Sequence, residues 1–341
     1  MRNHEVVTAH RLLDEKGALI EPGWSRSLVQ IYDRNDIKKR KTRIKEWDYY
    51  YVMSHSNKIA LCLTISDLSY LGMASVSIVN LENATEHTDS IIVPFTMGKT
   101  NLPPTSAVGD VKFKNKKLAM EFLNKGDYRV LRVDYPEFDG GKGLRANVKL
   151  TDEPQDSMVI ATPWAEDKKA FYYNQKIDCL RASGKIEYDG QLIALDRELD
   201  FAGLDWGRGV WTYDNVWYWG SGSSQVDGVP FGFNIGYGFG DTSAASENVI
   251  FYDGVAHKFD DIVFNISDNF TDPWTFKSSD GRFDMDFVPI IDRNALVDAK
   301  IIVTDQHQVF GKMSGTAVLD DGRKIQLKDF LCFAEKVHNK Y

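Results

Sequence analysis

The sequence predicts an all-β protein built from two antiparallel barrels packed together. Three observations lead to this fold class: richness in aromatic residues and glycine, Asp-Gly turns between alternating segments, and a hairpin motif that occurs in each half. Aromatic residues make up 12% of the 341 residues, and 26 are glycine, which favours strands joined by tight turns. The length is sufficient for one large domain or two ordinary ones.

The repeated hairpin is the main evidence for two similar halves. Segments 183–202 and 314–334 both begin with Ser-Gly, continue to Asp-Gly, and end in an alternating run that closes with Ala. The second Gly and the final Ala are twelve residues apart in both segments. Because Asp-Gly between alternating runs is a strong hairpin signal, we divide the chain into an N-terminal barrel with an extended lead-in (1–203) and a C-terminal barrel (204–341).

Further strands are expected on both sides of this division. Residues 118–134 predict a hairpin that turns at 124–126, and residues 229–240 alternate aromatic or aliphatic side chains with glycine, Pro or Asn. Glycine is costly inside a strand, so the glycines of 229–240 indicate either strong curvature or close approach of another group. Asp-Gly pairs at 227–228, 253–254 and 280–281 separate the remaining strands.

Charge and cysteine usage exclude several classes of protein. The net charge of −8 argues against general binding to nucleic acid or to anionic membranes. Cys62, Cys179 and Cys332 lie far apart, which indicates reduced thiols and no zinc site. Since no signal-peptide core and no membrane-spanning stretch is found, we expect a cytoplasmic protein.

The usual catalytic motifs are missing from the sequence. It contains no G-x-S-x-G elbow, no phosphate-binding or dinucleotide fingerprint, and no closely spaced His or Cys pair. We therefore expect neither a metal nor a cofactor.

Residues 204–224 contain the main candidate site. Asp205 and Arg208 stand three residues apart in a glycine-rich segment, beside Trp206 and Trp211. One interpretation is structural: a salt bridge between them, or an arginine packed on a tryptophan, at the junction of the halves. The other is catalytic, with Asp205 as an acid, Arg208 as a positioning cation and Glu247 as a second carboxylate.

The following strand supplies candidate ligand contacts. Alternation places Trp217, Trp219 and Ser221 on one side, where the indole rings either fill a core or line a cavity with a polar end. Together with Trp206, Trp211 and Tyr237, they form the predicted ligand-binding set.

Five segments carry a family resemblance. They are R-I-K-E-W-D-Y-Y-Y at 43–51, N-Q at 174–175, L-D-W-G-R-G-V-W at 204–211, W-Y-W-G-S-G-S at 217–223 and E-N-V-I-F-Y-D-G at 247–254. With the closing D-G-x-x-I-x-L and F-x-C-F-A-E, they resemble the domain of unknown function 2804 family over nearly the whole chain. More distantly, the chain is similar to tandem lipocalin-like proteins, among them carotenoid hydratases and tocopherol-cyclase-like enzymes.

The resemblance implies two lipocalin-like barrels, with a hydrophobic molecule bound in one barrel or between them. The family name leaves the activity open, so no catalytic residue is transferred, and fold alone does not determine function. The leading hypothesis is a protein that binds a hydrophobic or amphipathic small molecule. The alternatives are a cofactor-independent hydratase, cyclase or isomerase with Asp205 or Glu247 as its acid, a carbohydrate-binding or carbohydrate-active protein, and a purely structural role.

Overall fold

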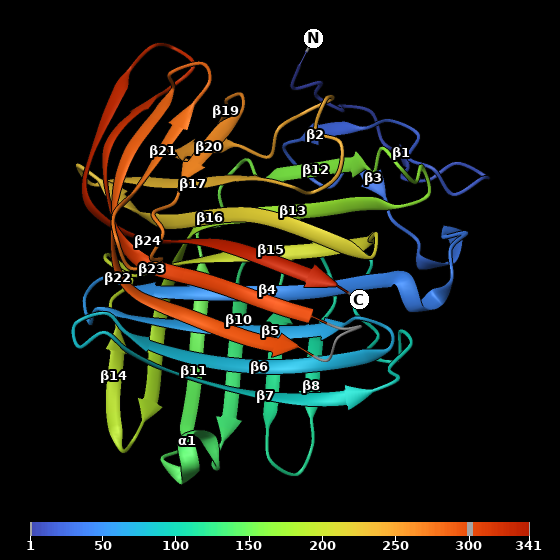
Figure 1. Cartoon of the computed structure of the whole chain (residues 1–341). Helices are drawn as coiled ribbons and strands as arrows, with labels where there is room; N and C mark the ends of the chain where they lie inside the picture. The colour runs from blue at the N-terminus through green and yellow to red at the C-terminus, as the bar shows by residue number, and fades with distance from the viewer. Residues whose placement is uncertain (1, 299–302, 341) are drawn as a thin grey trace.

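The computed structural model describes residues 2–298 and 303–340, and it consists almost entirely of two curled antiparallel sheets (Figure 1). This confirms the predicted all-β fold. The remaining elements are short and lie at the edges of the two sheets: β1 (His10–Arg11), β3 (Gln30–Ile31), the 3-10 turns Arg34–Asp36 and Lys41–Arg43, and the single helical turn α1 (Phe138–Gly141).

The first sheet has thirteen strands, of which ten form a continuous path in the order β7-β6-β5-β4-β15-β13-β11-β10-β9-β8. In the remaining pairings, β12 contacts β13 and β2, and β14 contacts β13. The bounds of its strands are β2 (Gly23–Ser25), β4 (Ile44–Ser54), β5 (Ile59–Asp67), β6 (Leu71–Asn80), β7 (Thr85–Pro94), β8 (Val111–Lys114), β9 (Ala119–Asn124), β10 (Arg129–Tyr135), β11 (Leu144–Thr151), β12 (Met158–Pro163), β13 (Phe171–Tyr188), β14 (Gln191–Leu195) and β15 (Phe201–Val210).

The second sheet has nine strands in the order β19-β18-β17-β16-β24-β23-β22-β21-β20. Its strands are β16 (Asp214–Val226), β17 (Val229–Tyr237), β18 (Val249–Tyr252), β19 (Val255–Lys258), β20 (Ile262–Asn265), β21 (Trp274–Ser278), β22 (Phe283–Asp298), β23 (Val303–Val318) and β24 (Lys324–Lys340). All the predicted Asp-Gly turns connect neighbouring strands, and the predicted turn at 124–126 connects β9 to β10.

Both sheets close in the same way, which supports the internal repeat. In each half the last strand returns to pair with the first, β15 with β4 and β24 with β16. The first half has separate strands β14 and β15 where the second half has the continuous strand β24. Gly184 and Gly315 occupy matching places, with φ angles of 115° and 153°, and a Cβ on either would lie 2.2 Å from a neighbouring backbone oxygen.

The chain passes from the first sheet to the second between Val210 and Asp214. Residues 204–210, expected at the start of the second barrel, instead form most of β15 in the first sheet. All ten residues of β15 are buried, so no polar face in the sequence marks the sheet to which the strand belongs. The division into two domains stays a prediction.

The second sheet also packs against the face of the first. β22, β23 and β24 are long and run across the face formed by β4, β5 and β6 (Figure 1). Arg293 of β22 donates to the Oγ of Ser77 on β6 at 2.7 Å, and Ile290 and Ile291 pack against the core cluster that includes the first sheet. The sheets therefore enclose a shared layer of side chains.

Replacing Gly315 should be strongly destabilising. We expect Gly315→Ala to lower the free energy of unfolding by about 3 kcal/mol or more, because the new Cβ adds a steric clash to an unfavourable φ. The matched control is Gly322→Ala, which also has positive φ but no atom within 4 Å of its Cβ, and it should cost only about 1 kcal/mol. Urea unfolding of both variants measures the difference, and equal losses would contradict the packing argument.

Candidate functional site

Side chains from both sheets meet in a buried layer between them, here called the inter-sheet layer. Alternation along β13, β15 and β4 directs Lys176, Asp205 and Tyr49 to the same face, since these residues are cross-strand neighbours. The opposite side of the layer is formed by residues of the second half: Trp219, Glu247 and Glu335. The Tyr49 and Trp219 rings meet edge to face at 5.8 Å, which joins the two sides.

Asp205 is held in this layer as one partner of a buried ion pair. Its Oδ2 lies 3.0 Å from Lys176 Nζ, and its Oδ1 accepts a 2.6 Å hydrogen bond from Asn174. The ammonium of Lys176 also lies 4.0 Å from the centre of the Trp219 ring, so a cation–π contact adds to the pair. The negative charge of Asp205 is therefore balanced by the positive charge of Lys176 inside the layer.

The expected salt bridge between Asp205 and Arg208 is not formed. Residues three apart in a strand point to opposite faces, so Asp205 enters the inter-sheet layer and Arg208 enters the interior of the first sheet. There Arg208 lies 3.0 Å from Asp48, donates to the backbone oxygens of Trp47 and Pro103, and covers the Trp206 ring at 4.3 Å. The predicted packing of arginine on tryptophan is thus present, but away from Asp205.

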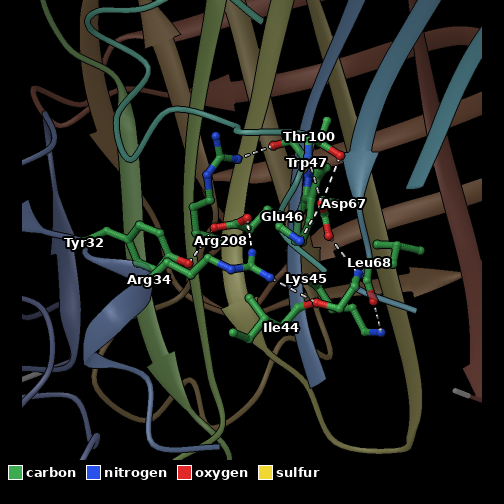
Figure 2. A network of polar contacts seen from close by, with 12 residues as sticks. Tyr32, Arg34, Ile44, Lys45, Glu46, Trp47, Asp67, Leu68, Thr100 and Arg208 are labelled. Atoms are coloured by element: carbon green, nitrogen blue, oxygen red, sulfur yellow. Dashed lines mark hydrogen bonds and ion pairs between the residues drawn. The ribbon is translucent and has the colours of Figure 1, made fainter. Parts of the chain in front are cut away.

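Figure 2 shows the polar network around Arg208. The Glu46 carboxylate accepts from Tyr32 at 2.7 Å and pairs with Arg34, while Lys45 donates to the backbone oxygen of Leu68. Arg208 is fully buried, and each guanidinium nitrogen donates to an oxygen of the protein. It acts as a structural clamp that joins β15, β4 and the segment after β7.

The carboxyl group of Glu247 makes fewer polar contacts than those of the other acids of the layer. The residue is 1% exposed, and its Oε2 lies 3.5 Å from the Tyr172 hydroxyl. Its Oε1 has no hydrogen-bond partner in the described part of the chain. Burial raises the pKa of Glu247 to about 7, against the partial opposing effect of Lys176. A Cβ at Gly236 would lie 2.5 Å from Glu247 Oε1, so this glycine of 229–240 admits a close neighbour.

Glu335 is another acid of the layer, in addition to Asp205 and Glu247. It was not identified from the sequence. Trp217 Nε1 and Gln308 Nε2 each donate to its carboxylate at 3.0 Å. Burial raises the pKa of Glu335 to about 7, while the Trp217 hydrogen bond and the charge of Arg293 oppose the increase. Glu247 and Glu335 are therefore two carboxyl groups of the layer whose pKa values lie near neutral pH.

A further buried acid, Asp178, links the two sheets at another point along β13. Its Oδ1 accepts from Tyr51 at 2.7 Å and from Ser221 at 2.9 Å, and its Oδ2 has no partner. Burial raises the pKa of Asp178 to about 7. Ser221, predicted to contact a ligand, is thereby used in a hydrogen bond between the sheets.

The remaining predicted site residues divide between different faces. Trp217 joins the inter-sheet face, as the alternation of β16 predicted, and Trp211 packs on it at 5.1 Å. Tyr237 stacks on Tyr218 at 4.5 Å, on the opposite face of the second sheet. The structure therefore brings Asp205, Glu247 and three of the tryptophans into or beside the layer and separates them from Arg208, Trp206 and Tyr237.

Several buried polar atoms of the layer have no hydrogen-bond partner among residues 2–298 and 303–340. Such atoms are rare in native structures, so each requires an explanation. They are Tyr49 OH, Asn174 Oδ1, Trp211 Nε1, Glu247 Oε1 and Gln308 Oε1.

One sequence signal for the missed residues does exist. In β13, Tyr172, Asn174, Lys176 and Asp178 alternate with neighbours on the other face, so one face of a buried strand is polar throughout. A polar face on a buried strand indicates a polar partner or a site. Glu335 has no such signal, because it follows the apolar run Cys332–Ala334 as a lone acid.

Within residues 2–298 and 303–340, no group of three or more His, Cys, Asp or Glu side chains is arranged to hold a metal ion. In the same ranges, no helix has the length and apolar character needed to span a membrane.

Comparison with known proteins gives a family match and a fold match. The family model described as Domain of unknown function (DUF2804) matches residues 3–341, whereas no curated protein matches the sequence. A solved structure assigned as AttH from Nitrosomonas europaea is 14% identical, with a TM-score of 0.55 over 91% of this chain and 98% of that chain. CghA, solved with Sch210972, is 10% identical, with a TM-score of 0.53 over 96% and 97% of the two chains.

These two structures confirm the tandem lipocalin-like fold expected from the resemblance. At such low identities, the similarity concerns the fold alone. Kievitone hydratase from Nectria haematococca is also 10% identical, with a TM-score of 0.48 over 97% of this chain and 98% of that chain.

The raised pKa of Glu247 predicts how the free energy of unfolding depends on pH. Between the ordinary value of 4.5 and about 7, the folded protein keeps a proton that the unfolded chain loses, so stability falls as the pH rises. Glu247→Gln removes the cost of ionising this carboxyl group in the folded protein. The variant should therefore be more stable than the wild type at pH 8, by roughly 1–3 kcal/mol, with little difference at pH 4.

Urea unfolding at several pH values measures this difference. Glu82→Gln is the control, because the Glu82 side chain is 66% exposed and its neutralisation should leave the profile unchanged. A constant difference between Glu247→Gln and the wild type across this pH range would contradict the assignment.

Proposed function

Since the chain belongs to the DUF2804 family, named for a domain of unknown function, its role must be inferred from its own site, and we propose that it binds a hydrophobic or amphipathic small molecule in the inter-sheet layer. The tryptophan and tyrosine rings form the apolar wall, and the buried carboxyl and amide groups form the polar end. Most small-molecule sites combine an apolar surface with a few fixed polar groups.

The observation that carries the proposal is the set of unpartnered polar atoms within this layer. A buried polar atom without a partner costs about 1–3 kcal/mol, so several in one place are a substantial loss of stability. Tyr49 OH and Trp211 Nε1 can donate, Asn174 Oδ1 can accept, and Glu247 Oε1 can do either according to its protonation. A ligand with polar groups at one end would satisfy them.

The structural comparison supports the binding of a small molecule by this fold. CghA was solved with the small molecule Sch210972, so this fold accommodates a small molecule in at least one protein. The expectation of a cytoplasmic protein without nucleic-acid partners also stays a proposal, supported by three buried free cysteines and a net charge of −8.

The first test is native mass spectrometry of the freshly purified protein. We expect a fraction of molecules with an added mass of a few hundred daltons, typical of a ligand of this class, that disappears on denaturation. Glu247→Gln and Asn174→Ala should reduce the retained fraction, whereas Glu82→Gln, on the surface, should not. The binding proposal fails if wild type and layer variants all lack a retained molecule and none binds after incubation with cell extract.

A second candidate function is an acid-catalysed hydratase, cyclase or isomerase without a cofactor. Glu247 favours it, because its carboxyl group has a pKa of about 7 and one free oxygen, as a general acid at neutral pH requires. Lys176 and Asp205 would position the substrate, and the rings of Trp217 and Trp219 would stabilise developing positive charge. Arg208 has no part in this version, since it lies on the other face of β15.

This candidate predicts that Glu247→Gln lowers kcat much more than it changes KM. The test requires that the retained molecule or its precursor is identified. Loss of a general acid should lower kcat by about 10²–10⁴-fold, while KM changes little because the amide keeps the size of the side chain. Steady-state kinetics and the pH profile of kcat measure the effect. If the variant retains the wild-type kcat, Glu247 is a binding group only.

The carbohydrate alternative receives no support from this site. It requires carboxyl groups that flank an open groove, whereas Asp205 and Glu247 are 8% and 1% exposed.

A further inference from the structure

A surface cavity of about 380 Å³ opens beside the inter-sheet layer. It lies where the segment after β12, the start of β16 and the segment after β17 come together. Its lining residues are Trp164, Ala165, Glu166, Asp214, Asn215, Val216, Gly238, Gly240 and Asp241. Asp205, Glu247 and Trp219 are not among its lining residues.

A continuous cluster of rings separates the cavity from Glu247. We call it the aromatic cluster, and it consists of Trp47, Trp164, Tyr172, Trp211, Trp217 and Phe239. Trp164 lines the cavity and contacts Trp211 at 5.5 Å, and Trp211 contacts Tyr172 at 5.9 Å. The hydroxyl of Tyr172 lies 3.5 Å from Glu247, so the ring contacts lead from the cavity to the acid.

Trp211 contacts all five other rings of this cluster, and Phe239 contacts three of them. The Phe239 ring stacks on Tyr172 at 4.7 Å with an interplanar angle of 17°, and it also contacts Trp211 and Trp217. The two neighbours of Phe239 in the chain, Gly238 and Gly240, both line the cavity. The backbone on either side of the Phe239 ring is held to β12 by two hydrogen bonds, from Thr162 Oγ1 to the Phe239 oxygen and from Asp241 N to the Pro163 oxygen.

One polar group of the cluster has no partner. Trp211 Nε1 is buried, with 3% of the residue exposed, and it donates to no atom of the residues that the structure describes. An indole N–H is only a donor, so its partner must be an acceptor such as a carbonyl or hydroxyl oxygen.

We propose that this cavity is the entrance to the inter-sheet site, that Phe239 closes it, and that the ligand is a flat unsaturated molecule with an oxygen acceptor. The ligand ring takes the place of Phe239 against Tyr172, and its oxygen accepts from Trp211 Nε1. This assignment rests on the proposed function, because it names the route and ligand class of the same site. The carboxyl groups of Glu247 and Glu335 disfavour an anionic ligand at the inner end.

The entrance is tested by the association rate of a neutral flat probe, N-phenylnaphthylamine, followed by stopped-flow fluorescence. Val216 is 41% exposed and lines the cavity, so Val216→Trp should slow association by about tenfold with a smaller effect on stability. The matched control is Val263→Trp on β20, where the valine is 54% exposed and lies outside the cavity. Phe239→Ala should instead accelerate association by about fivefold.

The ligand class is tested by competition at equilibrium. Naphthol should displace the probe, whereas dodecanol, a saturated alcohol, should not. Trp211→Phe keeps a ring but removes the N–H. It should therefore weaken the binding of naphthol by about fivefold and leave the affinity for the probe nearly unchanged. Equal displacement by dodecanol would overturn the ligand class.

The outcomes separate the entrance from the function. If the probe binds and Val216→Trp associates as fast as Val263→Trp, the entrance is wrong while the binding proposal stands. If neither the probe nor naphthol binds the wild type, the ligand class and entrance are both overturned, and native mass spectrometry still decides whether the layer holds another molecule.

Discussion

The structure depends on one constraint: β15 is buried on both faces, and successive side chains of a strand must point to opposite sides. Every residue of this strand therefore faces either the interior of the first sheet or the layer shared with the second. Asp205 and Arg208, three residues apart, are assigned to different environments by this geometry alone. Each then needs its own partner of opposite charge, Lys176 and Asp48 respectively, because an unpaired buried charge would be far more costly.

The charges on the two faces have different consequences. Arg208 donates at every nitrogen and fixes the segment around Pro103, so it is a structural element. The layer on the other face is not satisfied in this way, because Glu247 has no ion-pair partner among the described residues. Stability is lost there, as at many functional sites, where polar groups are arranged for a molecule other than the protein itself.

Much of the fold could be predicted from sequence because turns and repeats are local signals. Asp-Gly pairs mark hairpins at 189–190 and 321–322, and their matching surroundings indicated two similar halves. The boundary was predicted at residue 203, whereas the chain passes to the second sheet only after Val210. Because β15 is buried on both faces, its sequence has no alternation of polar and apolar residues that would have shown to which sheet it belongs. Pairing partners such as Lys176 with Asp205 depend on contacts between strands far apart in the sequence, which no local pattern contains.

The candidate site was predictable only in part for the same reason. The alternation of β16 correctly placed Trp217 and Trp219 on one face. Glu247 was named only as a second carboxylate, and its burial is seen only in the structure. Glu335 was missed because its role comes from Trp217 and Gln308, which reach it across neighbouring strands. The glycines of 229–240 were assigned mainly to curvature, whereas Gly236 makes room for the Glu247 carboxyl group.

The pairing of first and last strands has a consequence for biosynthesis. β16 pairs with β24, so the second barrel closes only when β24 is available. The first barrel can close earlier, once β15 has been synthesised and has paired with β4. During translation, the first sheet would therefore expose Lys176 and Asp205 before Glu335 can cover them. The proposed ligand site is therefore complete only after β24 has added Glu335 to the layer that β13 and β15 have already begun.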